Sequence, residues 1–135
     1  MDYEKRTNRV AKKHGLKLEI IDKHYGCHFF DDEKNKQTRR IYTCKLSKGK
    51  VAYTFEFGAS LANPKAPSMY DVLSCLQKYD VGSFEDFCSE FGYNSETISE
   101  YKRINKLYDS VCEEYEWFSS LFDDGEIPKD VLEIN

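Results

Sequence analysis

Apolar side chains in the last third of the chain recur with the period of one long α-helix. They alternate at spacings of three and four residues, which places them on one helical face. The positions are Tyr101, Ile104, Tyr108, Val111, Tyr115, Phe118 and Phe122, and Ile98, Leu107, Cys112 and Leu121 widen the stripe. A stripe this broad and this aromatic favours packing on the chain's own sheet and short helices. Asn94 or Ser95 is expected to cap the start of the helix. A coiled-coil homodimer, which buries a narrower seam, is the alternative.

The first part of the chain has the pattern of one helix followed by an antiparallel sheet. Residues 3–14 are predicted to form the helix, with Asp2 and Glu4 at its start and Lys12 and Lys13 at its end, which suits the helix dipole. Gly15 is suited to end the helix. Apolar and polar residues then alternate in three segments, at residues 16–22, 40–46 and 51–57. The last two flank a turn at Gly49, which predicts a hairpin. Residues 24–30 either extend the first strand or form a fourth.

The second part of the chain is predicted to be helical. Residues 58–67 form a connector with two prolines, and two capping boxes follow it, because Ser68 and Ser83 each stand three residues before an aspartate. The fold prediction is one α+β domain over residues 1–135. It has an N-terminal helix, a three- to four-stranded antiparallel sheet over residues 1–57, and a helical half over residues 68–135 whose long helix packs on the sheet.

Cysteine usage and hydropathy predict the compartment of the protein. The chain has five cysteines, an odd number without a disulfide-like spacing, and its polar start is unlike a signal peptide. No segment is apolar enough to span a membrane, so we expect a cytoplasmic protein. His24, Cys27 and His28 supply only half of a zinc site, and catalytic and nucleotide-binding motifs are lacking. We therefore predict no metal, no cofactor and no enzymatic activity.

Charge is divided unevenly along the chain. Residues 1–67 carry 15 Lys and Arg against 8 Asp and Glu, whereas residues 68–135 carry 5 against 16. Such an asymmetry is typical of partner-binding surfaces. The basic residues around the expected hairpin are Lys34, Lys36, Arg39, Arg40, Lys45, Lys48 and Lys50. They suit either contact with a nucleic-acid backbone or simple protection of a sheet edge.

Acidic residues gather where the long helix is expected to end. They are Glu113, Glu114, Glu116, Asp123, Asp124 and Glu126. Acids at a helix C-terminus oppose the helix dipole, which costs about 0.3 to 1 kcal/mol each at low salt. A surface that binds a basic partner accounts for this arrangement, and a plain solvated face is the alternative.

One string resembles a known family. Residues 53–93 read YTFEFGASLANPKAPSMYDVLSCLQKYDVGSFEDFCSEFGY and cover the expected hairpin strand, the connector and both capped helices. This string is similar to a family of small phage and prophage proteins of gut bacteria. The resemblance implies an accessory protein of a mobile element. Since such proteins often counter host defences, it also implies an anti-CRISPR or related inhibitor, without assigning a role to any residue.

Two functions follow as predictions. The first is non-enzymatic binding and inhibition of a bacterial defence protein, such as a CRISPR effector, in the cytoplasm of the host cell, through the acidic residues. The alternative is nucleic-acid binding by a phage accessory protein through the basic hairpin.

Overall fold

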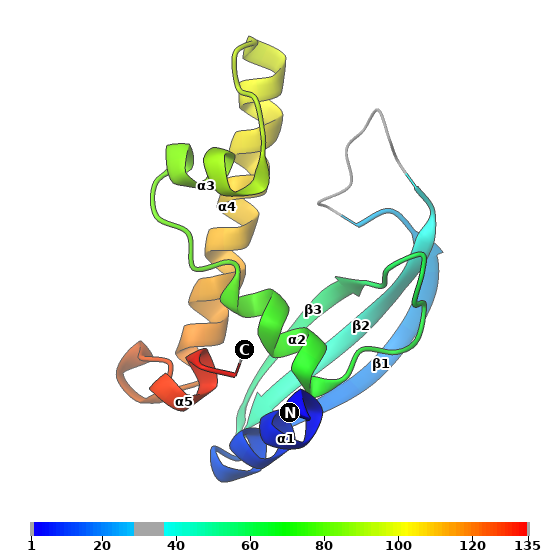
Figure 1. Cartoon of the computed structure of the whole chain (residues 1–135), viewed down its shortest axis with the longest axis vertical. Coiled ribbons are helices and arrows are strands. Elements are labelled where there is room, and N and C mark those ends of the chain that lie inside the picture. Colours follow the sequence, from blue (N-terminus) through cyan, green and yellow to red (C-terminus); the bar gives the residue numbers. More distant parts are fainter. Residues whose placement is uncertain (1, 29–36, 135) are drawn as a thin grey trace.

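A computed structural model describes residues 2–28 and 37–134 and shows an α+β fold, as predicted (Figure 1). A curved antiparallel sheet forms one side of the molecule, and helices lie along its concave side. The elements are α1 (Tyr3–Lys13), β1 (Leu16–Gly26), β2 (Arg39–Lys48), β3 (Val51–Gly58), α2 (Met69–Gln77), α3 (Phe84–Phe91), α4 (Ile98–Ser120), the 3-10 helix η2 (Asp123–Gly125) and α5 (Lys129–Leu132).

Within the described residues, the sheet has three strands in the order β1-β2-β3. The predicted hairpin joins β2 to β3 through a two-residue loop, in which Lys48 pairs with Val51 and Gly49 has a φ of 60°. A side chain at that position would be strained, which explains the glycine. The first strand continues to Gly26, and a bulge interrupts it between Ile20 and Asp22. Residues 29 and 30, the end of the segment expected to extend this strand or form a fourth, lie outside the described residues.

Local hydrogen bonds set the starts of the helices. Both predicted capping boxes form, with Ser68 before α2 and Ser83 before α3. The expected start of the long helix at Asn94 or Ser95 is wrong, because Thr97 caps α4 by accepting a hydrogen bond from the Glu100 amide at 3.2 Å. Asn94 instead accepts a hydrogen bond from the Glu96 amide at 3.1 Å and holds the preceding turn.

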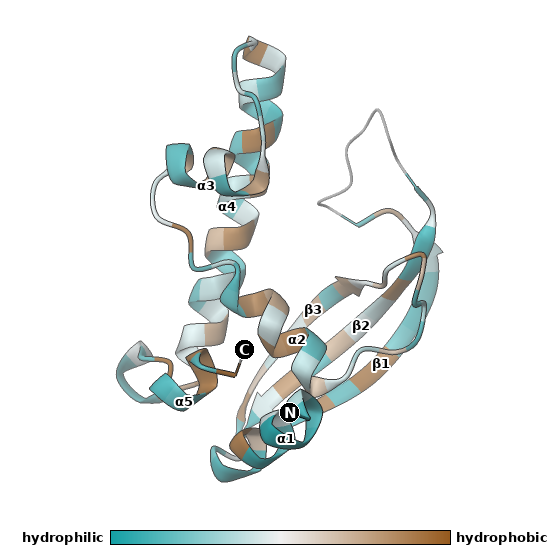
Figure 2. Ribbon diagram, viewed as in Figure 1, coloured by the Kyte–Doolittle hydropathy of each residue, from teal (hydrophilic) through white to brown (hydrophobic). Residues whose placement is uncertain are grey.

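The core lies between the sheet and the helices α2 and α4. Its buried side chains come mainly from the inner face of β2 and β3 and from α2, α4 and α5, and α1, β1 and α3 contribute one each. Figure 2 shows hydrophobic residues along α2 and in recurring bands on α4, whereas α1 is mostly hydrophilic. The long helix is packed within the molecule, as predicted, and its second half contacts β3 and α2.

The buried seam of α4 differs in phase from the predicted stripe. The seam consists of Ile104, Leu107, Val111, Glu114 and Phe118 within the helix, followed by Leu121. The predicted tyrosines lie beside it: Tyr101 is exposed, and Tyr108 is partly exposed and donates its hydroxyl to the Gly82 carbonyl oxygen at 2.6 Å. A tyrosine ring can pack while its hydroxyl reaches a polar partner, so tyrosines suit the flank of a seam.

The first half of α4 extends beyond the sheet together with α3 (Figure 1). The two helices are joined by aromatic contacts, in which the Phe87 ring lies 5.6 Å from Tyr108 and the Phe84 ring lies 5.1 Å from Tyr101. Ile98, at the tip of α4, is 78% exposed. Within residues 2–28 and 37–134, no helix combines the length and hydropathy needed to cross a membrane.

Candidate protein interface

The structure separates the six acidic residues that were predicted to bind a partner. Glu113 and Glu116 are exposed on the second half of α4, whereas Glu114 between them is only 9% exposed and faces the sheet. Three more are exposed beyond the end of α4, namely Asp123, Asp124 and Glu126. Two exposed glutamates therefore lie beside one buried glutamate, at some distance along the chain from the other three acids.

A groove runs between the edge strand β3 and α4. It is lined by Tyr53, Thr54, Phe55 and Glu56 from β3 and by Ser110, Glu113, Glu114 and Trp117 from α4. We call it the Trp117 groove, and its volume is about 320 Å³. A second hollow of about 520 Å³ shares Glu113 and Trp117 with it and is completed by Glu116 and Ser120. Trp117 and Glu113 thus lie on the border of both hollows.

Trp117 is held in place and still accessible. Its ring stacks on Tyr53 with 5.7 Å between ring centres and 8° between planes, and Tyr53 stacks in turn on Phe55 at 5.0 Å. The tryptophan is nevertheless 52% exposed. A preoriented aromatic ring beside the carboxylates of Glu113 and Glu116 can bind a cation or an amphipathic side chain.

Glu114 is the buried carboxylate among the residues that line the Trp117 groove. Burial raises the pKa of its carboxyl group to about 7, although a side-chain hydrogen bond with Tyr53 acts in the opposite direction. Burial first, and then the charge of Glu114, raise the pKa of the Tyr53 hydroxyl. The partly buried thiol of Cys75 on α2 and the hydroxyl of Tyr79, just after α2, also lie close enough for the Glu114 charge to raise their pKa values.

The structure also separates the predicted basic surface. Lys34 and Lys36 lie outside the described residues. Arg40 binds Tyr25, with its Nη2 atom 2.7 Å from the hydroxyl and its guanidinium 5.3 Å from the ring centre. The Lys48 ammonium lies 4.9 Å from the centre of the Phe122 ring at the end of α4.

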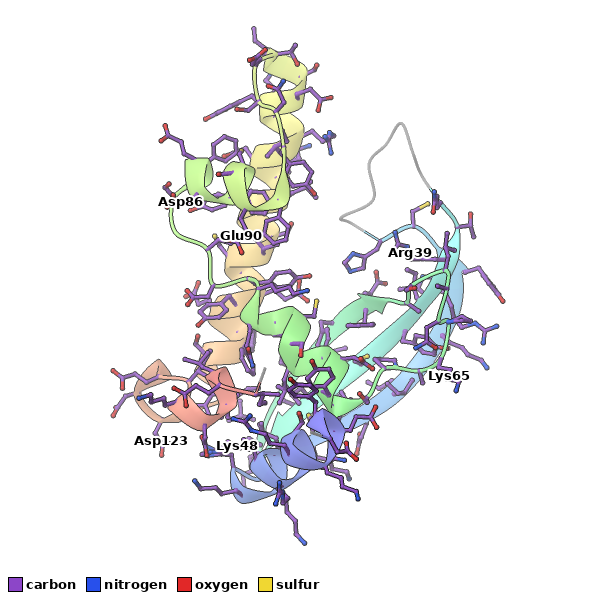
Figure 3. The ribbon with its side chains drawn as sticks, viewed as in Figure 1. Arg39, Lys48, Lys65, Asp86, Glu90 and Asp123 are labelled. Carbon is purple, nitrogen blue, oxygen red and sulfur yellow. The ribbon has the colours of Figure 1, made fainter. Side chains whose placement is uncertain are left out.

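The remaining basic residues do not form one surface with Arg40 and Lys48. Arg39 and Lys48 lie near opposite ends of the sheet (Figure 3). Lys45 is paired across the strands with Glu19, and Lys50 lies in the hairpin turn. Since Arg39 and Arg40 are successive strand residues, their side chains leave opposite faces of the sheet. The described basic residues therefore do not form one continuous surface.

A smaller cleft brings together residues that sequence analysis kept apart. It has a volume of about 230 Å³ between the far end of β3, α2 and α3, and His28, Cys75 and Phe91 are among its lining residues. Burial raises the pKa of the Cys75 thiol, and its Sγ atom lies 3.6 Å from the Tyr79 hydroxyl. A thiol with a raised pKa is a poor nucleophile, so this cysteine has the properties of a core residue.

Trp117 is the functional candidate that the sequence analysis missed. It lies off the predicted apolar stripe and directly follows Glu116. The signal that could have found it is its residue type, because exposed tryptophans are enriched at protein interfaces. Among residues 2–28 and 37–134, no group of three or more His, Cys, Asp or Glu side chains is arranged to hold a metal ion.

Comparison with models of protein families, with curated proteins and with solved structures gives no match to this chain.

Proposed function

We propose that this chain is a non-enzymatic protein-binding domain whose partner presents a basic surface to the Trp117 groove. The observation that carries the proposal is Trp117 itself, which is half exposed, stacked on Tyr53 and bordered by Glu113 and Glu116. Binding sites in proteins are typically centred on such aromatic anchors, and tryptophan and arginine are the residues that contribute most often.

Charge supports a basic partner over a neutral one. Within the described part of the chain, no salt bridge joins Glu113 or Glu116 to a cation, and Glu56 is exposed on the opposite side of the groove. An arginine over the indole ring contributes about 0.5 to 1 kcal/mol when exposed and about 2 kcal/mol when desolvated. The neighbouring carboxylates add attraction and steer the approach of a positive surface.

The class of partner comes from the resemblance of residues 53–93 to small phage and prophage proteins. It suggests a bacterial defence protein, with a CRISPR effector as the first class to test. Such effectors hold nucleic acid in positively charged channels. An acidic groove with an exposed tryptophan can occupy the mouth of such a channel, and inhibition then follows because the nucleic acid is excluded.

Phage plating on cells with an active CRISPR effector tests this proposal, together with co-purification of the effector with the full chain. Expression of the chain should protect a targeted phage, and the effector should be retained. The double variant Glu113→Lys/Glu116→Lys should lose both properties. The matched control is Glu85→Lys/Glu90→Lys, which makes the same charge change at exposed positions on α3 and should retain both. The inhibitor proposal is wrong if the wild-type chain neither protects the phage nor retains an effector.

The alternative function, nucleic-acid binding, has a separate test. The described basic residues are dispersed, and Arg40 and Lys48 already contact aromatic rings of the chain. If the chain bound a DNA or RNA duplex at about 50 mM salt, with an affinity that fell steeply as salt was added, the alternative would replace our proposal. Arg39→Glu/Arg40→Glu should then abolish binding, while Glu113→Lys/Glu116→Lys should not weaken it.

A further inference from the structure

The outer edge of β3 has hydrogen-bonding groups that the sheet does not use. The two-residue loop makes Lys48 and Val51 a hydrogen-bonded pair, and the same applies to every second pair along the ladder, including Leu46 with Tyr53. Ala52, Thr54 and Glu56 consequently direct their backbone N–H and C=O groups away from β2. The Glu56 carbonyl oxygen lies 3.2 Å from the Nε2 atom of His28, so this outward group already has a partner. Among the described residues, no hydrogen bond reaches the outward groups of Thr54.

The two edges of the sheet are built differently. The other edge strand, β1, has a bulge between Ile20 and Asp22 and a salt bridge of 2.9 Å between Lys17 and Glu19. Bulges and charges of this kind prevent an edge strand from pairing with another chain. Residues 51–55 of β3 contain no charged residue and no proline. This part of the β3 edge therefore lacks these protections.

The unpaired edge opens onto the Trp117 groove. Four successive residues of β3 form one wall of the groove, and at about 3.3 Å per residue they span about 13 Å, enough to pair with a short strand. The helical wall opposite carries Glu113, Glu114 and Trp117. Glu114 is more than nine-tenths buried and lines the groove, where the Tyr53 hydroxyl is its hydrogen-bond partner. A carboxylate has about four acceptor sites, so it can accept further donors.

We propose that an extended, arginine- or lysine-bearing segment of the partner adds to β3 as a fourth, antiparallel strand and directs its cationic side chains at Trp117 and Glu113. This inference rests on the proposed function and specifies how the partner binds. Main-chain hydrogen bonds supply affinity in this mode, and alternate side chains supply specificity. A second copy of the chain is a poor occupant, because it would bring two acidic grooves together.

The geometry predicts which amides of the segment matter. In an antiparallel ladder, residues directly opposite each other share a face of the sheet. The residue that hydrogen-bonds to Thr54 therefore points its side chain to the outer face, away from α4. The cationic residues on either side of it point toward α4, and their own N–H groups face away from β3.

Three synthetic peptides test this prediction on the unmodified full chain. The first is an acetylated eight-residue peptide in which arginine alternates with valine. The second is N-methylated at the valines and the third at the arginines, so all three have the same charge. Trp117 is the single tryptophan of the chain, and its fluorescence reports binding in the groove directly. N-methylation of the valines should weaken binding by about tenfold or more, because several hydrogen bonds are lost. N-methylation of the arginines should change the affinity less than about threefold.

Variants of the chain provide the second measurement. Thr54→Pro removes the outward amide without removing a hydrogen bond to β2 and should weaken binding of the unmethylated peptide by about tenfold. Thr54→Val keeps the amide and should bind as the wild type does. Amide hydrogen exchange at Thr54 should slow when the peptide is bound. If Thr54→Pro fails to fold, the methylated peptides still decide the question.

The outcomes separate the two proposals. Equal affinities for the two methylated peptides, with Glu113→Lys/Glu116→Lys abolishing binding, would leave the acidic groove as a binding site and overturn strand addition. If only the arginine-methylated peptide bound more weakly, the added strand would be parallel, because the arginine N–H groups would then be the ones that bind β3. That result would overturn the antiparallel arrangement. Binding of none of the three peptides would overturn the strand addition, while phage protection by the wild-type chain would still support the proposed function.

Discussion

Replacement of Glu114 by glutamine should stabilise the fold in a pH-dependent manner. Glu114 occupies a core position of α4 between Val111 and Phe118, and burial raises the pKa of its carboxyl group from the ordinary value of 4.5 to about 7. The folded protein therefore holds this proton more tightly than the unfolded chain does. Below pH 4.5 the carboxyl is protonated in both states, and its titration makes no difference to stability.

The size of the effect follows from the difference between the two pKa values. As the pH rises from 4.5 to about 7, the unfolded chain releases the proton while the folded protein retains it, so the free energy of unfolding falls. Each pKa unit corresponds to about 1.36 kcal/mol, which gives a full loss of about 3 kcal/mol above pH 7. Glutamine has nearly the same shape, keeps a hydrogen-bonding group for Tyr53 and does not ionise, so this loss should be absent from Glu114→Gln.

Urea denaturation at several pH values between about 4.5 and 8.5 measures this effect. The stability advantage of Glu114→Gln over the wild type should grow by about 3 kcal/mol across that range. Glu113→Gln, one residue away and exposed, is the matched control and should show no such growth. An advantage that is the same at every pH, or the same growth in the control, would show that the Glu114 carboxyl is not desolvated in the fold. Tyr53, Cys75 and Tyr79 face Glu114, but their pKa values are raised and they stay neutral in this range.

Three further predictions concern the fold. Phe118→Ala should lower the free energy of unfolding by about 3 to 5 kcal/mol, because Phe118 is fully buried. Ile98→Ala, at the exposed tip of α4, should change it by no more than about 0.5 kcal/mol. Similar losses in the two variants would contradict the assignment of Phe118 to the buried seam. Ser83→Ala should cost about 1 kcal/mol in thermal unfolding by removing the cap of α3, and an unchanged melting temperature would contradict the capping box. Gly49→Ala should destabilise by about 1 kcal/mol or more, since the turn holds this residue at a φ of 60°, and a neutral result in urea denaturation would argue against that turn.

The parts of the fold that depend on local chemistry could be predicted from the sequence. Capping boxes at Ser68 and Ser83 and the glycine turn at Gly49 involve residues within a few positions of each other, so spacing alone identifies them. The start of α4 was misplaced because several polar residues in a row can cap a helix. Only the structure shows that Asn94 holds the preceding turn while Thr97 caps the helix.

The phase of the long helix needed information that the sequence does not contain. Periodicity placed Tyr108 and Tyr115 on the buried stripe and left Glu114 on the surface, because tyrosine counts as apolar and glutamate as charged. The structure turns the helix so that Glu114 enters the seam beside Leu107, and the Tyr108 hydroxyl reaches a polar partner at its side. This rotation also places Trp117 against Tyr53 on the neighbouring strand. The Trp117 groove is therefore a product of tertiary packing.

Part of the charge asymmetry between the two halves of the chain is accounted for by contacts between them. Basic residues of α1 are matched within the chain: Lys13 and His14 both contact the Asp130 carboxylate, at 2.9 and 2.7 Å, and Arg6 donates to the Glu133 carbonyl oxygen at 2.6 Å. Asp130 belongs to the short C-terminal helix, so these contacts join opposite ends of the chain. The basic and acidic halves thus neutralise each other where α1 meets α5.

The Trp117 groove, in contrast, is an acidic region whose exposed glutamates are not paired in this way. Glu113 and Glu116 have no salt-bridge partner among the described residues, and Lys48, the cation on the neighbouring hairpin, lies over the Phe122 ring. Unmatched charge beside an exposed tryptophan attracts a cationic ligand more strongly than the same charge spread over the surface. Neutralising two glutamates at the groove should therefore weaken partner binding more than neutralising two at α3, although both changes alter the net charge equally.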